Sequence, residues 1–212
     1  NSGADPGADV QIIIGDLQMD GAIIQTINSG DRDGGNISIN ATTAGLTTGA
    51  SILSNTGFDF STTFLPVGFG NGGNITADVG TLDLTNGASI QSVNYIGGLG
   101  QSGNVTIPHG GNVTIQGLKG SGSAAEKVHL VDGSYILTQT SGTGRGGDVH
   151  VTADRLTLEN RSLIFTVARD FTVNSILPNF VLPVKGGDIS LNVGTLNLLG
   201  GPLGGSQIGS IS

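Results

Sequence analysis

A two-part phrase that recurs from one end of the chain to the other constrains its fold more than any other feature. The phrase is clearest as GGNITA at residues 72–77 followed by TLDLTNGASI at residues 81–90. Its first half returns at Gly34, Gly110, Gly146 and Gly186. The five starts therefore lie 38, 38, 36 and 40 residues apart along the chain. A repeat of this length is typical of a protein built from stacked structural units.

The spacing inside the repeat is also regular. From the second glycine of the first half to the start of the closing motif, the distance is 14 residues in the four repeats that end at Gly49, Gly87, Arg161 and Gly201. In the remaining repeat it is 22 residues, from Gly111 to Gly133, and the surplus falls in GLKGSGS at residues 117–123. Fixed core spacing with an insertion at a set corner predicts a solenoid.

Short apolar alternations predict the strands of each unit. In the repeat that begins at Gly72, apolar residues alternate at 75–77, alternate again at 82–84 and return at Ile90. Serine and threonine fill many positions between them, and 38 glycines in 212 residues disfavour long helices. We therefore predict an all-β fold, a right-handed parallel β-helix of about six three-strand coils.

The ends of the chain suggest where this domain begins and what lies beyond it. We predict that residues 1–9 are a turn-rich lead-in and that residues 10–212 form the repeat domain. The chain begins with Asn1, and its last repeat reaches Ser212 without a polar cap. We expect a fragment of a longer array, or copies that associate end to end or laterally, because an open end leaves backbone groups unpaired.

Composition and charge narrow the classes of function. The net charge is −8, and the eight Lys and Arg residues are scattered rather than gathered in a basic stripe, so nucleic-acid binding is not expected. The chain has no cysteine and therefore no disulfides or thiolate metal ligands. No apolar run approaches the ~20 residues of a membrane-spanning helix, so no such segment is predicted.

The residue that follows each Gly-Gly pair predicts a column along the stack. It is always Asn or Asp, at Asn36, Asn74, Asn112, Asp148 and Asp188. Stacked amides hydrogen-bond along the axis of cross-β assemblies. We therefore predict that these five residues form a structural ladder.

Two insertions hold six of the seven phenylalanines, at residues 55–71 and 168–185. The aromatic residues predicted to bind a partner are Phe58, Phe60, Phe64, Phe69, Phe171 and Phe180. One interpretation is a flap that covers a flank of the stack. The other is an apolar patch for a partner, a glycan or a neighbouring copy, because aromatic residues are enriched at interfaces.

The carboxylates leave a further interpretation open. Asp148 and Asp188 are expected about one layer apart, where they could hold a calcium ion or act as acid and base on a polysaccharide. The same column holds asparagine in the other repeats, which favours the ladder. We predict no catalytic residue, no metal site and no cofactor, and keep a weak calcium site as the alternative.

Two phrases carry a resemblance to a known family. GGNITADVGTLDLTNGASIQS at residues 72–92 and GNVTI at residues 103–107 resemble the repeats of filamentous-haemagglutinin-type exoproteins of bacterial two-partner secretion, especially the large cyanobacterial-style ones. The resemblance covers nearly the whole chain, which lacks the amino-terminal secretion domain of that family. The family shares no catalytic residues that could be carried over to this chain.

The resemblance implies a non-enzymatic, secreted or cell-surface fibrous protein. Such proteins act in adhesion, aggregation or filament formation, and their partners lie on host or neighbouring cells and include glycans. A polysaccharide-binding or polysaccharide-cleaving protein on the same fold is the alternative, because fold alone does not determine function.

Overall fold

The computed structural model describes residues 7–28, 33–56, 70–95, 109–141, 144–169 and 184–211. The strands are β1 (Val10–Asp20), β2 (Ile23–Asn28), β3 (Ile37–Thr47), β4 (Ser51–Thr56), β5 (Ile75–Leu84), β6 (Ser89–Tyr95), β7 (Val113–Gln116), β8 (Lys127–Leu130), β9 (Tyr135–Ser141), β10 (Gly144–Arg145), β11 (Val149–Glu159), β12 (Leu163–Arg169), β13 (Val184–Lys185), β14 (Ile189–Leu199) and β15 (Gln207–Ile211). In these ranges, no helix has the length and hydropathy that crossing a membrane requires.

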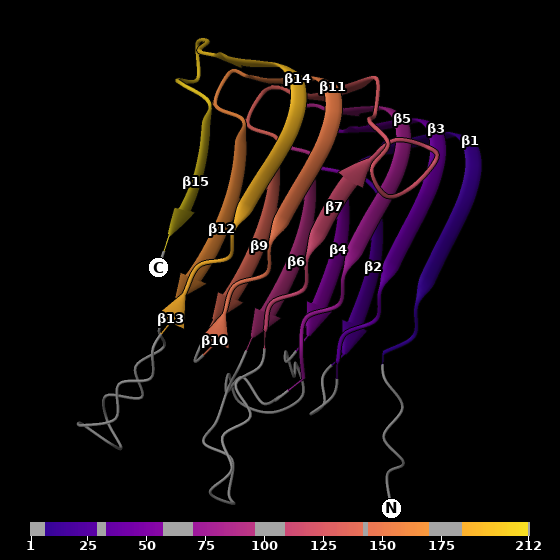
Figure 1. Ribbon diagram of the computed structural model, residues 1–212, viewed down its shortest axis with the longest axis vertical. Coiled ribbons are helices and arrows are strands. Elements are labelled where there is room, and N and C mark those ends of the chain that lie inside the picture. Colours follow the sequence, from indigo (N-terminus) through magenta and orange to yellow (C-terminus); the bar gives the residue numbers. More distant parts are fainter. Residues whose placement is uncertain are drawn as a thin grey trace, which may run out of the picture.

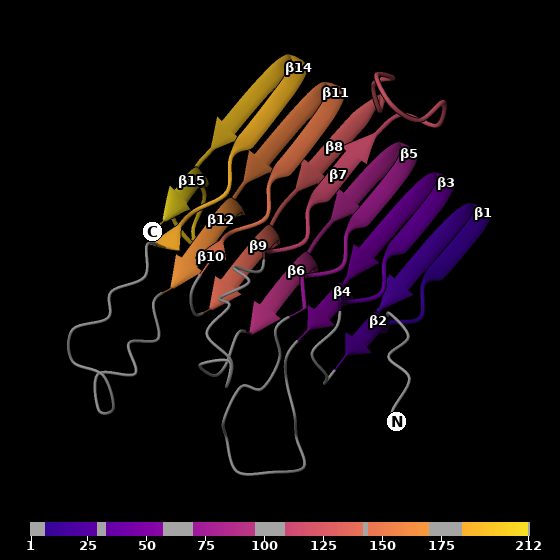
Figure 2. The ribbon, with the colours of Figure 1, turned by 60° about the horizontal axis from the view of Figure 1, so that its bottom comes forward.

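The strands stack in parallel into two large sheets (Figure 1). Sheet A has the order β1-β3-β5-β7-β11-β14, with β8 beside β5 and β11, and sheet B has the order β15-β12-β9-β6-β4-β2. Strands β10 and β13 form a separate pair. Each repeat thus gives one layer, with a strand in sheet A followed by a strand in sheet B, and successive layers lie side by side (Figure 2).

The predicted right-handed parallel β-helix of about six three-strand coils is wrong. Two alternations that were expected as separate strands form one continuous strand, β5, which pairs with β3 on both sides of Gly80. Sheet B is flat. Within sheet A, the strands β5, β7, β11 and β8 form a small closed set. The short strands β7 and β8 both pair with β5 and β11, β7 with their first halves and β8 with their second halves. The observed fold is all-β, with two parallel sheets and two main strands in most layers.

The core lies between the two sheets. In β5 the inward side chains alternate with half-buried ones, and Ile75 and Leu84 are fully buried. Ile90 of β6 faces them from sheet B and is also fully buried. Burying one such side chain stabilises the fold by about 1.5–3 kcal/mol, so the rows of Ile, Leu and Val hold the layers in register.

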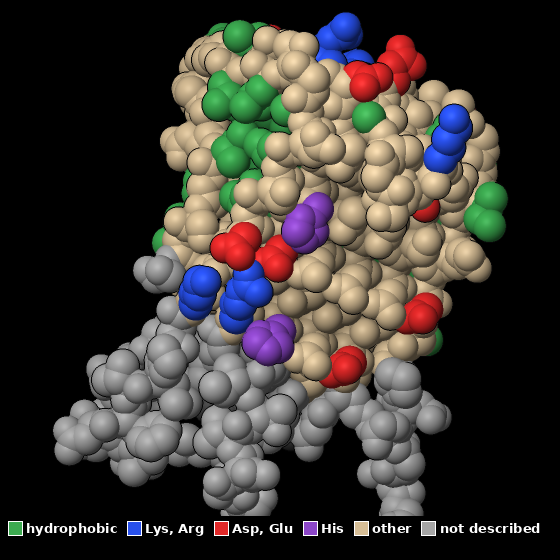
Figure 3. All heavy atoms as spheres, viewed as in Figure 1, with side chains coloured by type: hydrophobic (Ala, Val, Ile, Leu, Met, Phe, Trp, Pro, Cys, Tyr) green, Lys and Arg blue, Asp and Glu red, His purple; other side chains and the backbone are tan. Residues whose placement is uncertain are grey.

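The face in Figure 3 is mostly polar side chain and backbone, with a hydrophobic strip along one side.

The Gly-Gly pairs form the corner that leads into each strand of sheet A. A Cβ on Gly111 would lie 2.1 Å from the main-chain oxygen of Gly73 in the preceding layer. The buried hydroxyl of Ser92 donates a hydrogen bond of 2.9 Å to that same oxygen. Glycine is therefore required because neighbouring layers approach too closely here for any side chain.

Candidate functional site: a polar groove between two side-chain columns

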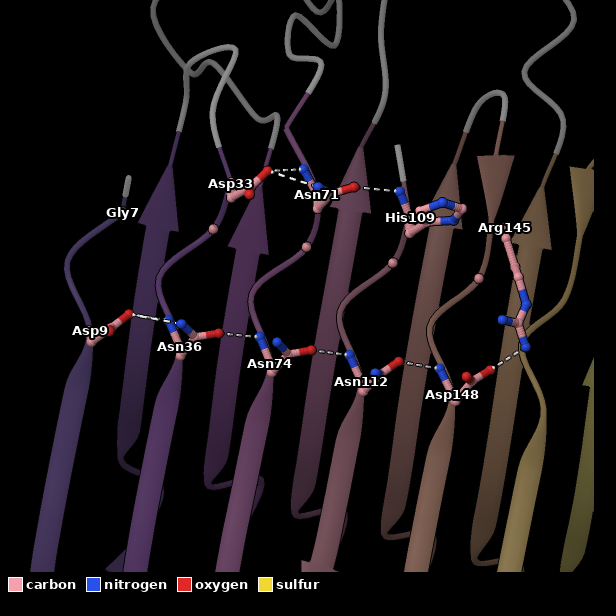
Figure 4. Close-up of a pocket in the computed structure, with 14 residues that line it drawn as sticks. Gly7, Asp9, Asp33, Asn36, Asn71, Asn74, His109, Asn112, Arg145 and Asp148 are labelled. Carbon is pink, nitrogen blue, oxygen red and sulfur yellow. Dashed lines mark hydrogen bonds and ion pairs between the residues drawn. The ribbon is translucent and has the colours of Figure 1, made fainter. Parts of the chain in front are cut away.

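The predicted ladder residues do lie in one column (Figure 4). The main-chain N–H of Asn74 donates to Oδ1 of Asn36 at 3.0 Å, and that of Asn112 donates to Oδ1 of Asn74 at 2.9 Å. In the next two layers, the main-chain N–H of Asp148 donates to Oδ1 of Asn112 at 2.8 Å, and that of Asp188 donates to Oδ1 of Asp148 at 2.7 Å. The sequence predicts bonds between stacked amides, whereas each bond from Asn36 to Asp188 joins a main-chain N–H to a side-chain oxygen. Asp can replace Asn in this column because only the oxygen is used.

The column begins one layer earlier than the sequence analysis places it. Oδ1 of Asp9 accepts hydrogen bonds from the main-chain N–H of Asn36 at 2.7 Å and from its Nδ2 at 3.2 Å. Asp9 lies in the segment, residues 1–9, that the sequence predicts to be a lead-in. The signal that could have identified it is its place immediately before β1, which matches the place of Asn36 immediately before β3.

A second column, which the sequence analysis missed, lies on the other side of the glycine pairs. Oδ1 of Asp33 accepts bonds from the main-chain N–H of Asn71 at 2.7 Å and from its Nδ2 at 3.0 Å. Oδ1 of Asn71 in turn accepts from the main-chain N–H of His109 at 2.9 Å. Arg145 pairs with His109 and Lys185 pairs with Arg145, so the column changes from acidic to basic along the stack.

The two columns form the walls of a groove of about 560 Å³ that crosses several layers. Its floor is the first glycine of successive pairs, at Gly34, Gly72, Gly110 and Gly146. Figure 4 shows the column that begins at Asp9 and the column that begins at Asp33 running beside each other along the stack. The groove is open and polar, and it is elongated along the stack.

One wall of the groove carries hydrogen-bond donors that have no partner among the described residues. Asn74 and Asn112 use their Oδ1 atoms in the column, but their Nδ2 groups donate no bond to any described residue. Each amide nitrogen carries two N–H donors. Asn74 and Asn112 lie in neighbouring layers, so their side chains form a short row of amide donors.

The basic end of the groove is occupied by an ion-pair network. Nη2 of Arg145 lies 2.8 Å from Oδ1 of Asp148 and 2.6 Å from Oδ2 of Asp188. The two carboxylates are partners of one guanidinium, not an opposed acid and base, and a calcium ion here would compete with Arg145. Within the described ranges, no group of three or more His, Cys, Asp or Glu side chains is placed to hold a metal ion.

The aromatic residues predicted to bind a partner cannot be placed in this site. Phe58, Phe60, Phe64, Phe69, Phe171 and Phe180 lie outside the described residues. The hypothesis that they form a binding patch stays a prediction.

Comparisons with known proteins identify no relative. No family model matches this chain, and no curated protein or solved structure matches it. The resemblance to filamentous-haemagglutinin-type exoproteins therefore rests on the repeat phrases alone.

Proposed function

We propose that this chain is a structural and adhesive segment of a secreted or cell-surface fibrous protein of bacteria, without a catalytic role. The observation that carries the proposal is the regular pairing of equivalent residues between successive layers. Equivalent residues stay paired from β1 to β14 across sheet A and from β2 to β15 across sheet B. A chain that repeats one cross-section in this way makes a stiff spacer with a long, uniform surface.

The placement of the carboxylates supports adhesion over polysaccharide cleavage. A glycosidase needs two carboxyl groups that face each other across a bound sugar. Asp148 and Asp188 instead share Arg145, and the other acidic residues of the groove, Asp9 and Asp33, accept main-chain hydrogen bonds in separate columns. Each of these carboxylates is thus engaged in a contact between neighbouring layers, which supports the proposal.

Surface display would test the adhesive function directly. The chain would be displayed on a bacterium that does not aggregate, and the rate of settling and the retention on cell layers would be measured. The matched control is Ile90→Asp at equal surface density, because a carboxylate at this fully buried position disrupts the core. We expect cells that display the native chain to settle faster and to be retained. Equal behaviour of the two displays would overturn the proposal.

A further inference from the structure

We propose that the groove binds a neutral, extended, β-1,4-linked polysaccharide chain through the amides of Asn74 and Asn112, which donate no hydrogen bond to the described part of the chain. This inference rests on the proposed adhesive function and gives that function a site and a ligand class. It is carried by the spacing of the columns, the chemistry of their free atoms and the charge along the groove.

The spacing of the columns requires an extended ligand. Successive strands of sheet A are hydrogen-bonded, so equivalent side chains repeat every ~4.8 Å along a straight line. A ligand that contacts both Asn74 and Asn112 must place a hydroxyl group at each layer. Pyranose rings in an extended β-1,4-linked chain advance by a comparable distance and turn over alternately, so neighbouring sugars would meet neighbouring layers with hydroxyls of opposite ring edges, either of which can accept an amide N–H.

The free atoms of the groove suit hydroxyl groups. Asn74 and Asn112 supply N–H donors, while the carboxylates of Asp9 and Asp33 supply acceptors at the same groove. A sugar hydroxyl both donates and accepts, so a single kind of ligand group can bond to the amides and to the carboxylates alike. Each contact in such an open groove is weak, and binding gains strength from repetition over several layers.

The charge along the groove favours an uncharged chain over a polyanion. Asp9 and Asp33 place two carboxylates at one end, where an anionic polymer would be repelled. At the other end the guanidinium of Arg145 already holds Asp148 and Asp188. The chain as a whole has a net charge of −8, which opposes anionic polymers further.

The floor of the groove is formed by the fold before any ligand arrives. A Cβ on Gly72 would lie 2.3 Å from the main-chain nitrogen of Gly111, and a Cβ on Gly110 would lie 2.4 Å from that of Gly147. These glycines are needed for stacking and leave bare backbone beneath the ligand. A site that is already shaped requires little ordering on binding.

The test is a double substitution that removes the amide donors and keeps the column. Asn74→Asp with Asn112→Asp retains the Oδ1 acceptors, as Asp148 does at the same position in the next layer. The matched control, Asn192→Asp with Gln207→Glu, makes the same change of charge at exposed side chains of β14 and β15. Binding of cellohexaose, xylohexaose and mannohexaose would be measured by calorimetry and by NMR titration, after circular dichroism has shown that each variant is folded.

We expect the native chain to bind at least one of the three hexasaccharides more tightly than the matching disaccharide, and not to bind polygalacturonate. The groove variant should lose about tenfold in affinity, the equivalent of one or two neutral hydrogen bonds, and the control should bind like the native chain. The proposal is overturned if the native chain binds none of the neutral hexasaccharides, or if the groove variant binds as well as the control. Adhesion by displayed cells without glycan binding would retain the proposed function and reject this site.

Discussion

At the scale of single residues, the column depends on one side-chain oxygen in each layer. Asn74→Ala removes the acceptor of the Asn112 main-chain N–H, so we expect the free energy of unfolding to fall by about 1 kcal/mol. Asn74→Asp keeps that oxygen and should change stability little. Urea unfolding followed by circular dichroism measures both variants. If the Asp variant were as unstable as the Ala variant, the oxygen would not be the group that matters.

The pKa of the Asp16 carboxylate depends on a hydrogen bond between neighbouring layers. A hydrogen bond from the Thr43 hydroxyl, and secondarily one from Gln18, holds the pKa of Asp16 below its usual value. A lowered pKa in the folded state means that the carboxylate contributes stability above its ordinary pKa and loses it as the pH falls through the folded pKa. We expect Thr43→Val to raise the pKa of Asp16, as measured by NMR titration of the carboxyl carbon. Thr195→Val on β14 is the control and should leave the Asp16 pKa unchanged, since Thr195 makes no bond to Asp16.

At the scale of elements, the close approach of neighbouring layers makes the glycine corners intolerant of a methyl group. In Gly111→Ala the new Cβ would lie 2.1 Å from the oxygen of Gly73 and 2.5 Å from Oγ of Ser92. We expect a loss of about 1–3 kcal/mol in the free energy of unfolding, because strands β5 and β7 would have to separate locally. Gly15→Ala in β1 is the control, since a Cβ there meets no atom within 4 Å. A destabilisation by Gly15→Ala as large as that by Gly111→Ala would show that steric contact is not the cause.

At the scale of the whole molecule, the two edges of the stack determine whether copies join end to end. The edge strands expose apolar side chains, with Ile13 of β1 75% exposed and Leu198 of β14 48% exposed. One close contact would prevent two copies from stacking end to end with their glycine corners aligned. A Cβ on Gly187 would lie 2.0 Å from the main-chain oxygen of Gly147, and Ala8 occupies the equivalent position in the first layer but carries a methyl group. That methyl would meet the Gly187 oxygen of a preceding copy.

We therefore expect the native chain to remain mostly as single stacks and Ala8→Gly to promote end-to-end assembly. Light scattering and negative-stain electron microscopy, with and without calcium, would measure the lengths. Ala8→Val retains the obstruction and is the matched control. Long fibres of the Val variant would show that the copies join in another way.

The sequence by itself determined which residues face the core and which form the first column. Ile75, Leu82 and Ile90 are buried as the apolar alternation predicts, and Asn74 and Asp148 lie in one column, as their place after Gly-Gly predicts. Both features follow from local periodicity, since alternate residues of a strand share a face and equivalent residues of stacked layers align.

Only the tertiary structure decided how many strands each layer has and where the groove lies. Residues 75–84 form one strand because pairing with the neighbouring layers continues past Gly80, and that pairing involves residues far away in sequence. The column from Asp33 to Lys185 and the free amides of Asn74 and Asn112 depend likewise on which atoms of adjacent layers meet. A sequence pattern shows which positions repeat, but the contacts between the layers decide which of their hydrogen bonds are already made and which remain for a ligand.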